Sequence, residues 1–324
     1  MDRKLAPLIL LPGLLLTLAA AAAAPKASCP EWSSLYHQVA GGEEQYQVNR
    51  GENLTTLALR KGVKWQWLAA RNDIKKPFRL KPGMILKINT SHIVPAELDN
   101  GLVINLPELM LYYFRDGVYQ HRYSLAVGKR TWPTPTGDYA IQNKTRNPTW
   151  VVPPSIQEEM AEQGREVLEK VPPGPKNPLG AYWLGTSAPG VGLHATNIPW
   201  SVGHFVSHGC MRMLPDDIAE LYPQVAIGTP VKIIYRPIKM ALARQGRIYL
   251  EVHANIYRHA LDPQGWVEEV ARIHGLRDRI DWDRVTSILK AKDGIAYEVT
   301  RGAEAPGTRT AQSQGTSQKK PGSE

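Results

Sequence analysis

The 324-residue chain contains only two cysteines, Cys29 and Cys210, far apart in the sequence. No Cys-x-x-Cys pair occurs, so neither a thioredoxin-like redox motif nor a zinc ribbon is expected. The chain also lacks a Walker phosphate-binding loop and the glycine fingerprint of a dinucleotide-binding domain. We therefore predict no cofactor and no metal. A metal site built from His194, His208 and Cys210 is the alternative that the residue types leave open.

Long apolar runs are scarce as well. The first apolar stretch extends from Leu5 to Ala24. It follows Arg3 and Lys4 and ends in alanines. A charged start, an apolar stretch and small residues are typical of a secretory signal peptide, so we predict one over residues 1–27. No later stretch approaches the roughly 18 apolar residues of a membrane span, so none is expected after cleavage. An uncleaved anchor, or a lipoprotein modified at Cys29, is the alternative.

The charge is unbalanced, with a net charge of +9 and a pI near 9.4. A basic surface favours anionic partners, and these include nucleic acid, anionic lipid and a carboxylate-rich wall polymer alike. Simple solubility is the other interpretation. Charge by itself therefore does not choose the partner.

Residues 44–90 form a compact unit. A strand over Tyr46–Val48 precedes a helix over Leu54–Lys61, which Asn53 caps and Gly62 ends. A second helix is expected over 64–71 and a last strand over 85–88. This strand-helix-helix-strand unit resembles a LysM domain, on the residues Tyr46, Val48, Gly51, Leu54, Leu57, Ala58, Gly62, Val63, Leu68, Asn72, Leu80, Pro82, Gly83, Leu86 and Ile88. The resemblance implies binding to N-acetylglucosamine-containing glycan strands, and a mere spacer is the alternative.

Residues 98–236 read as a β-rich domain. Asp116-Gly117 predicts a hairpin between alternating strands. A helix is expected over 156–168, and the Pro- and Gly-rich stretch 172–180 predicts a stiff loop that suits the wall of a substrate groove or a rigid connector. The fold class is α+β and mainly β, with a sandwich-like or barrel-like domain after the small unit. Residues 237–300 predict a hairpin and two amphipathic helices, and 301–324 a disordered tail.

Thiol chemistry centres on the segment Ser207-His208-Gly209-Cys210. A nucleophilic cysteine needs a base for its proton and donors for the developing oxyanion. His194, His204 and His208 all qualify as the base by type; spacing leaves His194 and His208 open, and His204 is expected to be a bystander. Gly209 permits a close backbone approach, and Arg212 can lie on the face of Cys210 and meet a carboxylate. An inert cysteine, or a disulfide to Cys29, is the alternative to a reactive thiol.

The stretch from about Asn100 to Tyr235 resembles the catalytic domain of the YkuD-type L,D-transpeptidases, especially members from bacteria with an outer membrane. The resemblance implies that Cys210 is the nucleophile, His194 the base, and backbone near Gly209 the source of oxyanion donors. It is carried by Thr134-Pro135-Thr136-Gly137, Val171-Pro172-Pro173-Gly174-Pro175, Asn177-Pro178-Leu179-Gly180, Leu193-His194-Ala195-Thr196-Asn197 and Ser207-His208-Gly209-Cys210-Met211-Arg212-Met213. The family commonly has glycine where this chain has Ala195, which puts the local backbone geometry in question.

Further site residues follow from the same resemblance. Orienting roles are expected for Ser207, His208 and Ala195, and substrate contacts for Arg212, Asn197 and Tyr182. These residues, together with Cys210, His194 and Gly209, complete the predicted site.

The resemblance implies a periplasmic enzyme that forms a Cys thioester with the stem tetrapeptides of peptidoglycan. It would then make 3–3 crosslinks or attach an outer-membrane lipoprotein to the wall. Expected partners are stem peptides, glycan strands and such a lipoprotein, and not nucleic acid. A cysteine hydrolase of the wall and a non-catalytic wall-binding protein are the competing hypotheses.

Overall fold

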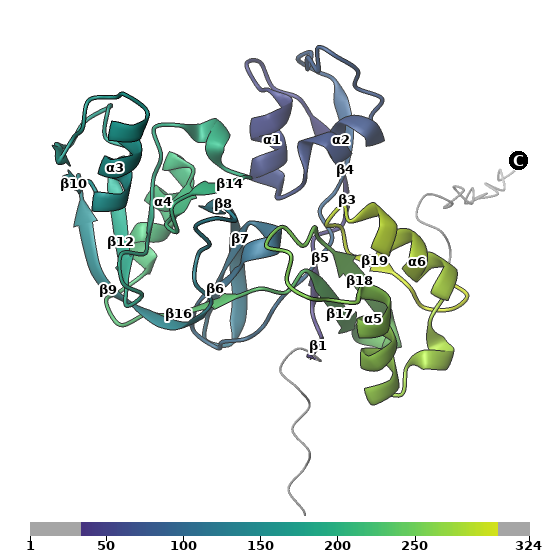
Figure 1. Cartoon of the computed structure of the whole chain (residues 1–324). Helices are drawn as coiled ribbons and strands as arrows, with labels where there is room; N and C mark the ends of the chain where they lie inside the picture. The colour runs from purple at the N-terminus through teal and green to yellow at the C-terminus, as the bar shows by residue number, and fades with distance from the viewer. Residues whose placement is uncertain (1–33, 304–324) are drawn as a thin grey trace, which may run out of the picture.

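The computed structural model describes residues 34–303 (Figure 1). The predicted signal segment, Cys29 and the tail from residue 304 lie outside this part of the chain. Figure 1 shows a small N-terminal unit above a β-rich body and a C-terminal unit beside that body. Within residues 34–303, no helix combines the length and the apolar character needed to cross a bilayer.

The N-terminal unit has the predicted strand-helix-helix-strand order. The Asn53 side chain accepts a hydrogen bond from the Thr56 N–H at 2.9 Å, which satisfies a free donor at the start of the first helix. Gly62 ends that helix in the left-handed conformation, with φ of 64°. The elements are β3 (Glu43–Gln47), α1 (Leu54–Lys61), α2 (Trp65–Arg71) and β4 (Ile85–Asn89).

The body is a closed barrel. Around it the strands follow the order β8, β15, β13, β12, β9, β16, β6, β7 and back to β8, with β14 added beside β8. The predicted mainly-β, barrel-like fold is therefore confirmed. The strands are β6 (Gly101–Asn105), β7 (Met110–Arg115), β8 (Val118–Gly128), β9 (Gly137–Arg146), β12 (Tyr182–Thr186), β13 (Gly192–His194), β14 (Phe205–Ser207), β15 (Met211–Met213) and β16 (Pro230–Ile234), and helix α4 (Pro215–Leu221) follows β15.

An insertion between β9 and β12 carries β10 (Trp150–Val151), α3 (Pro154–Glu162) and β11 (Lys170–Val171). The prediction of a helix as far as residue 168 is wrong. Gly164 adopts φ of 65°, and the Arg165 N–H bonds back to the Met160 carbonyl at 2.9 Å. This glycine ends the helix early because its left-handed conformation turns the chain away from the helix axis.

The C-terminal unit is a sheet covered by two helices. Its strand order is β1, β17, β18, β19, and β1 comes from the segment before the N-terminal unit, for which the sequence analysis predicts no strand. A two-residue strand has no periodicity to detect, which is why it escaped prediction. The elements are β1 (Leu35–Tyr36), β17 (Ile238–Leu242), β18 (Ile248–Val252), α5 (Pro263–Ile273), α6 (Trp282–Ala291) and β19 (Tyr297–Glu298), and β2 (Val39–Ala40) pairs with β5 (His92–Ile93).

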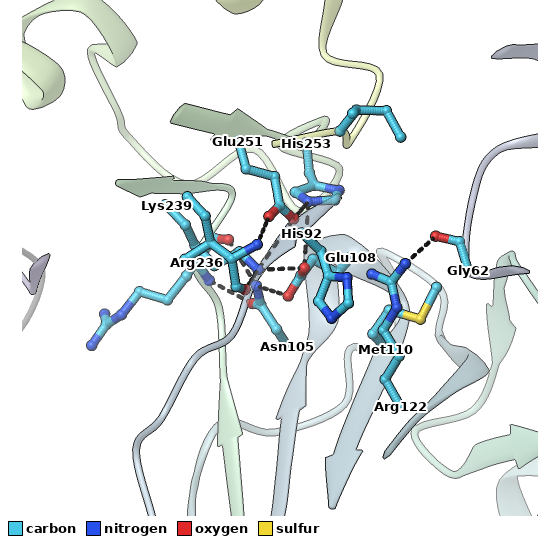
Figure 2. Close-up of polar contacts among 12 residues, drawn as sticks. Gly62, His92, Asn105, Glu108, Met110, Arg122, Arg236, Lys239, Glu251 and His253 are labelled. Carbon is cyan, nitrogen blue, oxygen red and sulfur yellow. Dashed lines mark hydrogen bonds and ion pairs between the residues drawn. The ribbon is translucent and has the colours of Figure 1, made fainter. Parts of the chain in front are cut away.

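The N-terminal unit is seated on the barrel through the end of α1. Ser124 donates its hydroxyl to the Leu59 carbonyl at 2.7 Å. Arg122 donates to the carbonyls of Gly62 at 3.2 Å and Thr90 at 3.3 Å, and Figure 2 shows its reach to Gly62. A cation is favourable at the carbonyl end of a helix, so Arg122 both satisfies free acceptors and complements the helix dipole.

Candidate active site

Strand pairing brings three side chains to one face of the barrel. His194 on β13 stands opposite Trp183 on β12 and opposite Arg212 on β15. Residues directly opposite on neighbouring strands project from the same face, while their neighbours Leu193 and Met211 point into the core. Cys210 lies two positions before Arg212, and the guanidinium charge acts on both the imidazole and the thiol.

Cys210 is a free, half-buried thiol. Its S–H donates to the Gly190 carbonyl at 3.4 Å. Burial raises the pKa of the thiol, while the backbone of Gly192 and the charge of Arg212 pull the pKa down less strongly. The sulfur is therefore mostly protonated near neutral pH, and nucleophilic attack requires a base that takes the proton.

His194 has the tautomer that such a base needs. Its side chain is 4% exposed, and Nδ1 lies 2.5 Å from the Ala195 carbonyl oxygen. A carbonyl only accepts, so Nδ1 carries the hydrogen and Nε2 carries the lone pair. The backbone of Pro178 also interacts with the ring. Burial lowers the pKa of His194 to about 4, so the ring is neutral at physiological pH. The Trp183 ring stacks on it with centroids 6.0 Å apart.

Ala195, the departure from the family's usual glycine, is accommodated by a neighbouring glycine. A Cβ added at Gly180 would lie 2.5 Å from the Ala195 Cβ, and Gly180 has φ of 63°. The alanine methyl thus fills space that Gly180 leaves empty. The carbonyl of Ala195 still bonds His194, because the orienting group belongs to the backbone.

The loop before the nucleophile is held by Ser207. Its hydroxyl donates to the Cys210 carbonyl at 2.5 Å and accepts from the Gly209 N–H at 3.2 Å. Gly209 has φ of 107°, a conformation that L side chains rarely adopt. The Gly209 N–H therefore points to Ser207, and the next donor along the chain is the Cys210 N–H.

His208 bonds to the insertion helix. Its Nε2 lies 2.6 Å from Glu159 on α3, and its ring meets Trp132 edge-on with centroids 4.5 Å apart. Burial lowers the pKa of His208, and Lys129 lowers it further. His204 hydrogen-bonds to the Val202 carbonyl at 3.2 Å.

The remaining predicted residues lie at the margin of this face. Asn197 is exposed and donates to the Lys176 carbonyl at 3.4 Å, which ties it to the Pro-rich loop. Tyr182 packs beside the core against Tyr222, with ring centroids 4.9 Å apart. The sequence interpretation missed Trp183 and Glu159, because only strand register and the fold of the insertion bring them to the site.

A second buried polar cluster joins the barrel to the C-terminal unit (Figure 2). Within the described part of the chain, Glu108, Glu251 and His253 are the side chains spaced closely enough to ligate a metal ion. Lys239 already supplies positive charge there, with Nζ 2.5 Å from Glu108 and 3.1 Å from Glu251. The cluster therefore forms a buried ion-pair network, and His253 joins it at 2.6 Å from Glu251.

Comparison with known proteins identifies two family domains in the chain. The L,D-transpeptidase catalytic domain (YkuD) matches residues 99–233, and the LysM domain matches residues 46–89. The chain is 34% identical to the probable L,D-transpeptidase YcfS of Escherichia coli K12, over 65% of this chain and 68% of that protein. It is 29% identical to the probable L,D-transpeptidase ErfK/SrfK of Salmonella typhimurium LT2, over 78% of this chain and 84% of that protein.

The catalytic domain of the Enterococcus faecium L,D-transpeptidase, solved by NMR, aligns over 43% of this chain and 99% of its own length. The identity is 24% and the TM-score 0.33. On the sequence matches, the chain belongs to the L,D-transpeptidase family of cysteine enzymes that act on peptidoglycan, and it carries an N-terminal LysM domain.

Proposed function

We propose that Cys210 attacks the amide between the third residue of a stem tetrapeptide, a diamino acid, and its terminal D-alanine. His194 Nε2 takes the thiol proton as the S–C bond forms, and the Cys210 N–H stabilises the oxyanion. The C–N bond then breaks, and D-alanine leaves with that proton. The acyl group stays on the sulfur as a thioester.

In the second half of the reaction an amine resolves the thioester. Neutral His194 accepts a proton from the amine as its nitrogen attacks, and the thiol is released with a new amide bond in place. The acceptor is the side-chain amine of another stem peptide, which gives a 3–3 crosslink, or the lysine of an outer-membrane lipoprotein. Both acceptors present the same chemistry to the site.

One observation carries this proposal: His194 is neutral, its Nδ1 is held by the Ala195 carbonyl, and it stands opposite Arg212, whose charge acts on both the imidazole and the Cys210 thiol. Arg212 supplies a positive charge that suits the terminal carboxylate of the peptide. The base is held by a backbone carbonyl, so its tautomer does not depend on a side chain that could titrate.

The LysM unit and the exported location complete the proposal. The unit is expected to bind glycan strands and thereby raise the local concentration of stem peptides. Hydrogen bonds from Arg122 and Ser124 hold the LysM unit against the barrel. The unit would therefore bind glycan at a fixed position relative to Cys210. The signal-like segment over residues 1–27 supports secretion to the periplasm, where the substrate lies.

Intact-protein mass spectrometry with a stem tetrapeptide tests the proposal. Wild type should gain the mass of the tetrapeptide less one alanine, and Cys210→Ala should gain nothing. An amine acceptor should discharge the adduct into a larger peptide, whereas discharge only to free tripeptide identifies a hydrolase. An unmodified wild type, or an adduct that persists in Cys210→Ala, contradicts the proposal.

A further inference from the structure

The segment after β18 returns to the barrel beside the nucleophile loop. Tyr257 from this segment stacks on Tyr235 with ring centroids 5.2 Å apart and meets Phe205 edge-on at 5.7 Å. The Tyr257 N–H donates to the Tyr235 hydroxyl at 2.9 Å, and that hydroxyl donates to Asn255 at 2.9 Å. The ring of Tyr257 is therefore held by two aromatic neighbours and through its own backbone.

The Tyr257 hydroxyl makes two hydrogen bonds at the end of β8. It donates to the Gly128 carbonyl at 2.8 Å and accepts from the Thr134 N–H at 3.3 Å. Burial raises the pKa of this phenol, so it keeps the proton that it donates. The loop between Gly128 and Thr134 packs tightly, because a Cβ at Gly128 would lie 2.5 Å from the Thr134 nitrogen.

Thr134 connects the Tyr257 hydroxyl to Gly209, the residue before the nucleophile. Its side-chain hydroxyl accepts from the Gly128 N–H at 2.9 Å and donates to the Gly209 carbonyl at 2.8 Å. A hydroxyl has a single proton, so the donor is committed to Gly209. Thr134 is 2% exposed, and water has little access to compete for this bond.

The Gly209 carbonyl and the Cys210 N–H are the two ends of one planar trans peptide. A bond that fixes the carbonyl also fixes the direction of the N–H on the opposite side. On the proposed function the Cys210 N–H is the oxyanion donor, and such donors act only when they are aimed in advance.

We propose that Tyr257 is a positioning residue that aims the Cys210 N–H at the oxyanion, acting through Thr134. This inference rests on the proposed function. It gives the C-terminal unit, which lies outside the matched catalytic domain, a part in positioning the nucleophile. The Tyr257 hydroxyl completes the chain of hydrogen bonds that ends at the Gly209 carbonyl.

Two reactions of the same sulfur test the inference. Acylation by the stem tetrapeptide passes through an oxyanion, whereas alkylation by iodoacetamide displaces iodide and needs only the thiolate. Tyr257→Phe keeps the ring stacking but loses the hydroxyl. We expect the acylation rate at saturating peptide to fall about 10- to 100-fold, less than the full loss of an oxyanion donor. The alkylation rate should stay within about twofold.

Thr134→Val should reproduce the selective loss, and Thr134→Ser, which keeps the hydroxyl, should restore most of the rate. Tyr297→Phe is the matched control, since it removes a hydroxyl of the same extension that bonds Asp293 at 2.7 Å. It should leave both reactions unchanged.

Normal acylation in Tyr257→Phe, or an equal loss in both reactions, overturns the inference. A wild type that is alkylated but never acylated contradicts the proposed function itself, and the inference falls with it.

Discussion

Two buried histidines, His194 in the barrel and His253 after β18, are similarly enclosed, at 4% and 7% exposed. Burial lowers the pKa of His194 to about 4 and that of His253 to about 3. Their partners differ. His194 bonds backbone carbonyls, whereas the Nε2 of His253 lies 2.6 Å from the Glu251 carboxylate within the Lys239 network.

The comparison shows that a strongly lowered pKa does not by itself identify a catalytic base. Desolvation acts on any enclosed imidazole. Chemistry requires in addition a nucleophile near the ring, and His194 stands opposite Arg212, which follows Cys210 by two positions. The network around His253 has a structural role, since it joins the turn between β6 and β7 of the barrel to the C-terminal sheet (Figure 2).

The largest expected difference between the two histidines is in acylation. His194→Gln should slow thioester formation by about 10²- to 10⁴-fold, the usual contribution of a general base. His253→Gln should acylate at the wild-type rate. Single-turnover mass spectrometry with the stem tetrapeptide measures both. Near-normal acylation in His194→Gln would assign the base role to another group, with His208 the first to examine.

The second difference is in stability. Lys239→Met leaves Glu108 and Glu251 buried without their cation, and removal of one partner of a buried pair costs about 3–5 kcal/mol. Urea denaturation gives the free energy of unfolding. Lys232→Met is the control, because its partner Asp138 is 76% exposed and such pairs contribute about 0–1 kcal/mol. Equal losses in the two variants would show that the network contributes no more than a surface pair.

The smallest expected effect is in the pH dependence of stability. His253 has a folded pKa of about 3 and an ordinary value of 6.5, so unfolding takes up a proton between these pH values. The contribution of neutral His253 to the free energy of unfolding is complete above pH 6.5. It is lost as the pH falls toward 3, at about 1.4 kcal/mol per pH unit at most. Glu108, whose pKa is raised by burial, opposes part of this slope.

His253→Gln should therefore lose stability less steeply than wild type between pH 6 and 4, as measured by urea unfolding at each pH. His194→Gln should also make the free energy of unfolding depend less steeply on pH in this range, because the pKa of His194 is lowered as well. If the free energy of unfolding depends on pH as in wild type for both variants, neither histidine has a lowered pKa in the folded protein.

Local sequence signals determined much of this protein. Asn53 and Gly62 set the ends of α1 by capping chemistry, and the Asp116-Gly117 pair set the β7–β8 hairpin. The Ser207–Cys210 motif located the thiol. Each of these rests on residues within a few positions of one another, which is why they can be read without the fold.

Tertiary structure alone decided the rest. Strand register placed Trp183 on His194, and the insertion carried Glu159 to His208. The C-terminal extension brought Tyr257 to Thr134 across 123 positions of sequence. A linear pattern records periodicity and local caps, but hydrogen bonds between distant segments depend on how strands pair and loops return. The thiol was therefore found from the sequence and its base from the family resemblance, while the contacts that hold the nucleophile loop required the folded chain.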